Sequence, residues 1–293
     1  MKKIFQKQVT KYLLLLLLSF YCKAANSQNF FTTFFLGGSN YSGDLGSPKF
    51  PLSNSHPAGG LGFLYELNNR MGVRMDATFG KISGADKDGG SNKSRNLSFI
   101  SDISEISIGF DYTLFDLYDY KVSPYFFAGV ARFGFNPYTK DKNGNVVFLA
   151  ELDTEGEGFY KDRKPYKTKQ TAIPFGGGLM WAIDDNHRIG IELGIRKTFT
   201  DYLDDVSTTY VDGNLLASKR GGTAAAIAYR GDELPGGLPY PADGAKRGNP
   251  KNKDWYYFTG ISYRMRLVPP HSRRQNNDGS RIRRSKISCP RIF

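Results

Sequence analysis

The chain has 293 residues, of which 40% are hydrophobic and 14% aromatic, and its formal net charge is +12. This charge is gathered at the two ends: residues 1–28 hold five lysines and no acid, residues 268–293 hold six arginines, one lysine and one aspartate, and residues 29–267 carry only +1. Because a nucleic-acid-binding protein needs a basic face on its folded body, this distribution argues against a nucleic-acid partner.

The first 28 residues have the layout of a secretory signal peptide. Four lysines precede an apolar run from Tyr12 to Cys22, and small residues follow. This run is shorter than the roughly 20 residues that a membrane-spanning helix needs. We therefore expect export and cleavage between Ala24 and Gln28. Cleavage leaves Cys289 as the only cysteine, so no internal disulfide is expected.

Eight segments of the remaining chain alternate between apolar and polar residues, which is the period-2 pattern of β-strands. The clearest segment ends the series: Trp255 and Ile261 share one face, and Arg264 and Arg266 share the other. In 124–135 both faces are apolar at one end, so the pattern leaves its outward face open. The predicted strands span residues 30–39, 59–67, 71–80, 105–114, 124–135, 173–183, 188–199 and 255–267.

The links between these strands alternate in length. Short links near 68–69, 116–122 and 184–186 alternate with long links near 42–56, 83–97, 137–171 and 201–254. In an up-and-down barrel this order places every short turn at one rim and every long loop at the other, as in outer-membrane barrels. We therefore expect residues 29–267 to form an all-β, eight-stranded antiparallel up-and-down transmembrane β-barrel with long extracellular loops. The links at 42–56 and 83–97 look like plain polar turns.

Charged residues lie in the middle of the predicted strands, on the face that is rich in glycine. They are Glu66, Arg74, Asp76, Glu105, Asp111, Glu192, Arg196, Arg264 and Arg266. Five carboxylates and four guanidiniums can pair inside an eight-stranded barrel, whose lumen is just wide enough for side chains. A soluble lipocalin-like barrel has the same period but would crowd the large aromatic face into the narrow core. The pattern predicts a membrane barrel whose lumen is filled by a charge network.

Aromatic side chains are expected to form two interfacial belts. The long-loop rim would hold Phe199, Trp255 and Tyr257, and the short-turn rim would hold Tyr65, Tyr112 and Trp181. Lys197 lies on the outward face between two apolar residues, so we expect its long side chain to reach the upper interface.

Two acidic clusters lie in the long links. Asp201, Asp204 and Asp205 follow the strand at 188–199, and Asp153, Glu155 and Glu157 lie in LDTEGEGF. Oxygen-rich clusters suit calcium, but neither cluster has the twelve-residue EF-hand layout. We interpret both as solvated loop acids, or as partners of Lys161, Arg163 and Lys164. Asp201 would then mark the place where a strand leaves the lipid.

The sequence shows no catalytic motif. His56, His187 and His271 have no His or Cys partner at ligand spacing, so a zinc site is not expected. There is no G-x-S-x-G elbow and no P-loop. The prediction is a protein that is not an enzyme and has no metal or cofactor.

Four stretches resemble a known family: IPFGGGL (173–179), ELGIRKTFTDYLDDVSTTYVD (192–212), GEGFYKDRKPY (156–166) and RGNPKNKDWYYFTGISYR (247–264). Together they resemble the PorG-type outer-membrane barrels of Bacteroidetes, which accompany the type IX secretion system and gliding motility. The resemblance covers about residues 29–267. Its most specific part includes a motif of unknown role: Thr200, Asp201, Tyr202, Leu203, Asp204 and Asp205.

The resemblance implies a structural role without catalytic residues. Proteins of this family sit in outer-membrane lipid and associate with periplasmic ring components of the secretion apparatus, including a lipoprotein. The alternative is a small porin or a surface-adhesion barrel that acts through its extracellular loops. A filled lumen argues against the porin.

The last 26 residues would follow the final strand into the periplasm. They form a basic tail with a polar first part, and we expect either a solvated segment or a peptide that docks on a periplasmic partner. The residues that would make the docking contact are Arg281, Arg283, Arg284, Lys286 and Phe293.

Overall fold

The computed structural model describes residues 29–45, 54–88, 92–160 and 163–267. Their strands are β1 (Phe30–Ser42), β2 (His56–Glu66), β3 (Met71–Ala85), β4 (Ser98–Thr113), β5 (Val122–Lys140), β6 (Val146–Phe148), β7 (Lys169–Ala182), β8 (His187–Thr198) and β9 (Trp255–Arg266). Their helices are η2 (Asp86–Asp88), η3 (Lys93–Arg95), α2 (Gly213–Arg220), α3 (Gly222–Ala228) and η4 (Gly231–Glu233). None of these helices has the length and apolarity to cross a membrane. The predicted signal peptide and the basic tail lie outside the described residues.

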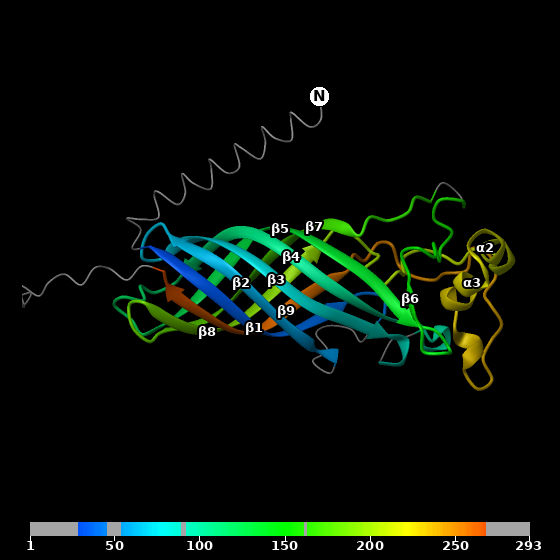
Figure 1. Cartoon of the computed structure of the whole chain (residues 1–293), viewed down its shortest axis with the longest axis horizontal. Coiled ribbons are helices and arrows are strands. Elements are labelled where there is room, and N and C mark those ends of the chain that lie inside the picture. The colour runs from blue at the N-terminus through cyan, green and yellow to red at the C-terminus, as the bar shows by residue number, and fades with distance from the viewer. Residues whose placement is uncertain (1–28, 46–53, 89–91, 161–162, 268–293) are drawn as a thin grey trace, which may run out of the picture. The chain divides into compact units, whose positions relative to one another are not determined.

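Eight of the strands form a closed antiparallel barrel (Figure 1). Each strand pairs with the next along the chain, β5 pairs with β7, and β9 pairs with β1 to close the ring. The predicted eight-stranded up-and-down barrel is therefore confirmed. The three-residue β6 pairs with the far end of β5 and was not predicted, because three residues are too few to show a period.

Several strands extend beyond the predicted segments, most of them toward the long loops. β4 begins at Ser98, seven residues before the predicted start, and β5 continues to Lys140. The residues that were missed include Ser101, Asp102 and Ser104, which interrupt the apolar alternation while the backbone pairing continues. The barrel wall is thus longer than its apolar band.

The short and long connections are sorted as the sequence predicted. Residues 67–70, 114–121 and 183–186 turn at one rim, while the long connections, with α2, α3 and β6, gather at the other (Figure 1). This order follows from up-and-down pairing, since every second connection returns to the same rim.

The apolar face of the strands points away from the barrel axis. Large side chains that are about half exposed or more include Leu36, Leu61, Phe63, Met75, Phe79, Ile106, Ile108, Phe110, Val130, Leu179, Ile191 and Ile261. The charged face points inward and is buried. A soluble barrel would bury the apolar face, so this arrangement is that of a barrel in lipid.

The aromatic belts are found where the sequence placed them, with one exception. Phe199 lies exposed near the long-loop rim, and Trp181, Tyr112 and Tyr65 lie exposed near the short-turn rim. Tyr257 is wrong as a belt residue, because it is only 2% exposed. It is the third residue of β9, between Asn40 of β1 and Ile195 of β8.

Glycines on the inward face make room for large lumen side chains. Gly176 of β7 lies directly opposite Gly194 of β8. A Cβ atom at either position would lie 2.9 Å from the Phe127 ring, closer than side chains tolerate. The glycine-rich polar face is therefore what lets one buried aromatic ring fit into a narrow barrel.

Candidate functional site

The lumen holds a network of ion pairs in three layers, counted from the short-turn rim to the long-loop rim. The lowest layer closes the short-turn end. Arg188 pairs with Glu66 at 2.6 Å. Tyr118, from the 114–121 turn, donates to the same carboxylate at 2.6 Å and accepts from Arg266 at 2.5 Å. In the same turn Leu117 packs inward against a small apolar cluster. The turn therefore folds across the barrel end as a plug.

The middle layer is built around Arg74. Its guanidinium contacts Asp76 at 2.7 Å, Glu192 at 3.2 Å and Asp111 at 3.7 Å. Arg264 pairs with Asp111 at 2.8 Å from the opposite wall. Each carboxylate thus meets a cation, which is the condition for burying charge in a protein interior.

The upper layer joins β4, β8 and β9. Arg196 pairs with Glu105 at 3.0 Å, and Tyr256 donates to the same carboxylate at 2.6 Å. The Arg196 guanidinium also lies 4.5 Å from the Phe258 ring, a cation–π contact. Aromatic rings fill the space above this layer.

Little free space remains between the layers. A cavity of about 20 Å³ lies beside Arg74, Asp76 and Glu192, which is room for about one water molecule. The barrel is therefore a filled cylinder along its charged length.

All nine residues of the predicted lumen network lie on the inward face of the barrel: seven are buried, and the side chains of Arg74 and Asp76 are 14% exposed. Arg266 bonds to Tyr118 and to the backbone oxygen of Asp185. The sequence reasoning missed Arg188, Tyr125 and Tyr256. Arg188 stands on the polar face of its strand and could have been included. Tyr256 lies on the same face of its strand as Arg264 and Arg266 and could have been included as well. Tyr125 lies in 124–135, where both faces are apolar at one end, so the pattern left its orientation open.

The long loops pack together into a folded structure, which we call the loop cap; it comprises the described residues of 43–55, 86–97, 141–168 and 199–254. Its apolar core continues the barrel core and includes Leu45, Leu97, Leu149, Leu203 and Val206. Residues from all four loops meet there, so the cap closes the second end of the barrel.

Asp204 ties two segments of the cap to strand β1 of the barrel. Its carboxyl group accepts from Tyr41 Oη at 2.5 Å, Leu45 N at 3.1 Å and Val206 N at 3.0 Å. Asp254 lies on the other side of the phenol, with Oδ1 3.2 Å from Tyr41 Oη. A phenol has one hydrogen to donate, so it serves both carboxyl groups only if one of them holds a proton.

Burial favours that proton. Burial, together with the nearby carboxyl groups of Asp44 and Asp201, raises the pKa of Asp204 to about 8. The pKa of Asp254 is raised by the same burial and by Asp204. Asp201 accepts from Ser207 Oγ at 2.8 Å, its Oδ1 is buried without a partner, and burial raises its pKa to about 7.

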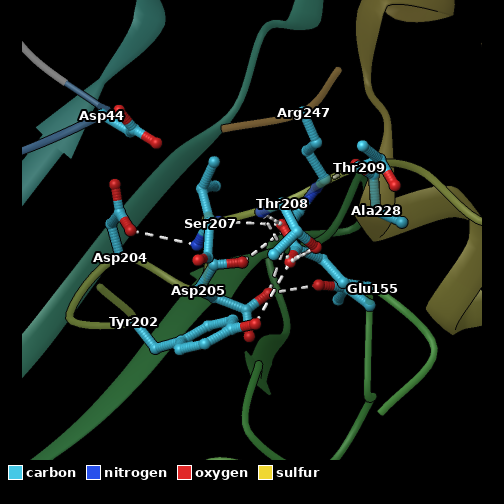
Figure 2. Close-up of polar contacts among 12 residues, drawn as sticks. Asp44, Glu155, Tyr202, Asp204, Asp205, Ser207, Thr208, Thr209, Ala228 and Arg247 are labelled. Atoms are coloured by element: carbon cyan, nitrogen blue, oxygen red, sulfur yellow. Dashed lines mark hydrogen bonds and ion pairs between the residues drawn. The ribbon is translucent and has the colours of Figure 1, made fainter. Parts of the chain in front are cut away.

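A second group of buried acids surrounds Arg247 (Figure 2). Arg247 pairs with Glu155 at 3.0 Å and with Asp205 at 3.6 Å. It also donates to the backbone oxygens of Ala228 and Asp205. The Glu155 carboxylate in turn accepts from Ser207 N and from Thr208 N and Oγ1. This cation therefore joins the 153–157 loop, the 200–208 segment and α3.

Asp205 and Glu157 complete this group. Asp205 accepts from Thr154 Oγ1 at 2.6 Å and from Tyr166 Oη at 2.7 Å, and its φ of 65° lies in the left-handed region. Glu157 is fully buried; its Oε2 accepts from Glu155 N, and its Oε1 has no partner. Burial, then Asp205 and Glu155, raise the pKa of Glu157 to about 8.

The interpretation of both acidic clusters as solvated loop acids was wrong. Asp153, Glu155, Glu157, Asp201, Asp204 and Asp205 are all less than 9% exposed. Arg163 donates only to the backbone oxygen of Glu155 within the clusters, Lys164 forms no ion pair with them, and Lys161 lies outside the described residues. Strand β8 ends because the chain enters the packed cap, where its polar groups bond to partners from other loops.

The expectation that the links at 42–56 and 83–97 are plain polar turns was also wrong. Leu45 of the first link is buried in the apolar core. In the second link Asp86 pairs with Arg95 at 2.6 Å, and both are buried. Arg95 also donates to the backbone oxygens of Asp44 and Arg247. In the family motif, Thr200 and Leu203 are buried, and Tyr202 stacks on Tyr166 with ring centroids 4.6 Å apart.

The cap's buried acids do not form a metal-binding arrangement. Within the part of the chain that the structure describes, no group of three or more His, Cys, Asp or Glu side chains has the geometry to hold a metal ion. The buried acids of the cap have a structural role. Their hydrogen bonds, and the ion pairs of the central Arg247, hold the four loops in one conformation.

The barrel is closed, its outer face is apolar, its lumen is filled and its loops form a folded cap. These features define the protein as a plugged β-barrel of the outer-membrane type. The chain belongs to the family described as Domain of unknown function (DUF6089), whose model matches residues 7–224.

Solved structures similar to this chain are also membrane barrels. The chain is similar to Ail, the attachment invasion locus protein of Yersinia pestis, at 13% identity over 82% of this chain and 99% of that chain, with a TM-score of 0.37. It is similar to the neisserial surface protein NspA at 9% identity over 81% of this chain and 97% of that chain, with a TM-score of 0.40. It is similar to OprG from Pseudomonas aeruginosa at 10% identity over 82% of this chain and 96% of that chain, with a TM-score of 0.33. No curated protein matches the sequence. Similarities at this level do not assign a function.

Proposed function

We propose that this protein is a non-catalytic outer-membrane barrel, exported through a cleaved signal peptide, that anchors or assembles a protein-secretion complex. The observation that carries the proposal is the lumen, filled by paired charges and closed at both ends. A barrel that offers no passage acts through its surfaces. The complex we propose is the type IX secretion system of gliding Bacteroidetes, with periplasmic ring components, including a lipoprotein, as partners.

The support for this partner is the sequence resemblance described above, together with the role of its motif in the fold. Residues 200–205 hold the loop cap on the barrel through Tyr41 and Arg247. A fixed cap over a filled barrel makes a rigid anchor. The short-turn rim, which faces the periplasm in outer-membrane barrels, is then the surface nearest to a periplasmic ring.

The test is capture of partners from solubilised outer membranes by the tagged, full-length protein. We would compare two matched variants that each replace two exposed apolar residues. Phe115→Ser with Tyr120→Ser changes the short-turn rim, and Val146→Ser with Phe148→Ser changes the cap. We expect periplasmic ring proteins to co-purify with the unchanged protein and the cap variant, and to be reduced in the short-turn variant.

The basic tail supplies a further arm of this experiment. We propose that Arg281, Arg283, Arg284 and Lys286 steer a periplasmic partner and that Phe293 anchors it. Deletion of residues 271–293 removes no strand, so the heat-modifiable migration of the folded barrel should persist while capture falls. If no variant changes capture, or if no periplasmic protein co-purifies at all, the anchoring proposal is wrong.

A second candidate is a surface-adhesion barrel. The observation in its favour is that the loops form an ordered cap with two helices and a buried core, and such a surface can present a fixed binding face. The same capture experiment separates the two functions. Adhesion predicts that the cap variant loses attachment to a host or abiotic surface, with secretion unchanged.

A further inference from the structure

The outward wall of the barrel carries a patch of three cations at its long-loop end. Arg132 of β5, Lys169 of β7 and Lys197 of β8 are exposed and lie on the lipid-facing side of the alternation. In the strand register, Arg132 of β5 lies opposite Thr171 of β7, and Lys197 of β8 lies opposite Ile173 of β7.

These pairings place the three residues on neighbouring strands and on one face. Arg132 lies opposite Thr171, so it is a diagonal neighbour of Lys169, at about 7–8 Å. Lys197 lies opposite Ile173, one strand over from Lys169 and four residues along it, which is about 14 Å between backbones. The long arginine and lysine side chains can therefore converge on one lipid headgroup from its two sides.

The patch adjoins the apolar band. Arg132 pairs on its other side with Ile106, which is 58% exposed. Lys197 lies with its Nζ 5.9 Å from the Trp255 ring centroid, and that ring packs edge-on against Phe175. Cations on the lipid face of a barrel destabilise it near the midplane and are tolerated at the interface, so this level of the wall is at the headgroups.

The patch also lacks counter-charge within the protein. Among the described strand residues, the acid on the outward face is Asp102, and Lys81 pairs with it at 3.0 Å. No ion pair joins Arg132, Lys169 or Lys197 to a described carboxylate. Three positive charges at the edge of a hydrocarbon band fit an anion that is itself attached to hydrocarbon.

We propose that Arg132, Lys169 and Lys197 form a binding surface for the phosphate group of an anionic lipid in the leaflet at the long-loop rim. Trp255 and Phe175 form the apolar shelf beneath it, against which an acyl chain packs. This surface does not depend on the secretion role, and it serves the barrel whichever partner it has.

The test uses the purified full-length protein in an uncharged detergent, with phosphatidic acid as the probe and phosphatidylcholine as the neutral lipid. Bound lipid is counted by native mass spectrometry during a titration. The triple variant Arg132→Gln, Lys169→Gln, Lys197→Gln removes the patch. The matched control, Lys87→Gln, Lys219→Gln, Lys251→Gln, removes the same charge from exposed loop positions.

A single cation near a charged lipid contributes about fivefold in affinity, so loss of three should weaken phosphatidic acid binding on the order of a hundredfold. The control variant should bind as the unchanged protein does, and phosphatidylcholine should bind weakly to all. Equal binding by the triple variant overturns the proposal. So does equal weakening by the control, or inorganic phosphate competing at the same concentration as the lipid.

The single variant Lys169→Glu keeps the test decisive if the triple variant does not fold. Lys169 is the first residue of β7, beyond the apolar band, so the barrel core is untouched. Reversal of one charge in the patch should still weaken binding at least tenfold. Binding that is unchanged by this reversal also overturns the proposal.

Discussion

Removal of the central cation of the loop cap is the sharpest test of the cap's construction. Arg247→Met keeps most of the side-chain volume and removes the charge. Glu155 and Asp205 are both fully buried, and in the described structure their ion pairs come from Arg247. The variant therefore leaves two buried acids that must either stay charged without a partner or take up a proton.

The magnitude follows from the burial. Breaking a buried ion pair by removing one partner costs about 3–5 kcal/mol, and the backbone oxygens of Ala228 and Asp205 lose a donor as well. The hydrogen bonds and ion pairs of this guanidinium all go to described residues outside the barrel strands, so the cost falls on opening of the cap. At about 1.4 kcal/mol per tenfold, hydrogen exchange in residues 199–254 should accelerate by roughly two to three and a half powers of ten.

The assay is hydrogen exchange followed by mass spectrometry in detergent micelles, with peptides of β3 and β4 as the internal reference. The double variant Arg247→Met, Glu155→Gln supplies the control, because the neutral amide needs no cation. It should recover part of the lost protection. If exchange in 199–254 stays within threefold of the unchanged protein, or if Glu155→Gln worsens the defect, the cap is not held by this ion pair.

The remaining predictions concern pH, conduction and the lumen. The pKa values of Asp201 and Asp204 are raised in the folded cap to about 7 and about 8. Their protonated forms therefore stabilise the folded cap fully below about pH 4, the pKa of an unfolded aspartate, and this stabilisation is lost as the pH rises through the two raised values. Proteolysis of 199–254, corrected with an unfolded substrate, should therefore be faster at pH 9 than at pH 5, and Asp204→Asn should flatten this response; greater resistance at pH 9 would refute the sign. Reconstituted in a planar bilayer, the protein should show no stable channel steps, and a regular unit conductance would contradict a filled lumen. Glu105→Ala leaves Arg196 buried and unpaired, so the barrel should lose about 3–5 kcal/mol of stability; an unchanged melting midpoint, with Glu105→Gln as the milder control, would show that the pair does not stabilise the barrel.

Alternation and loop order determined the barrel from the sequence alone. Successive side chains of a strand point to opposite faces, so residues such as Arg264 and Ile261 reveal their environment without knowledge of any partner. The same rule placed the lumen charges, since in an eight-stranded barrel an inward polar residue always meets the other inward residues. The rule failed where both faces of a strand are apolar: Tyr125 donates to the lumen carboxylate of Glu192, yet the sequence pattern did not assign Tyr125 to the inward face.

The loop cap was decided only by the tertiary structure. A loop has no period, so nothing near Asp204 in the sequence indicates that Tyr41, 163 positions away, will donate to it. The acidic residues looked solvated because an isolated carboxylate is solvated. They are buried here because four loops, brought to one rim by the strand order, supply the hydroxyls, amides and guanidiniums that a buried carboxyl group requires.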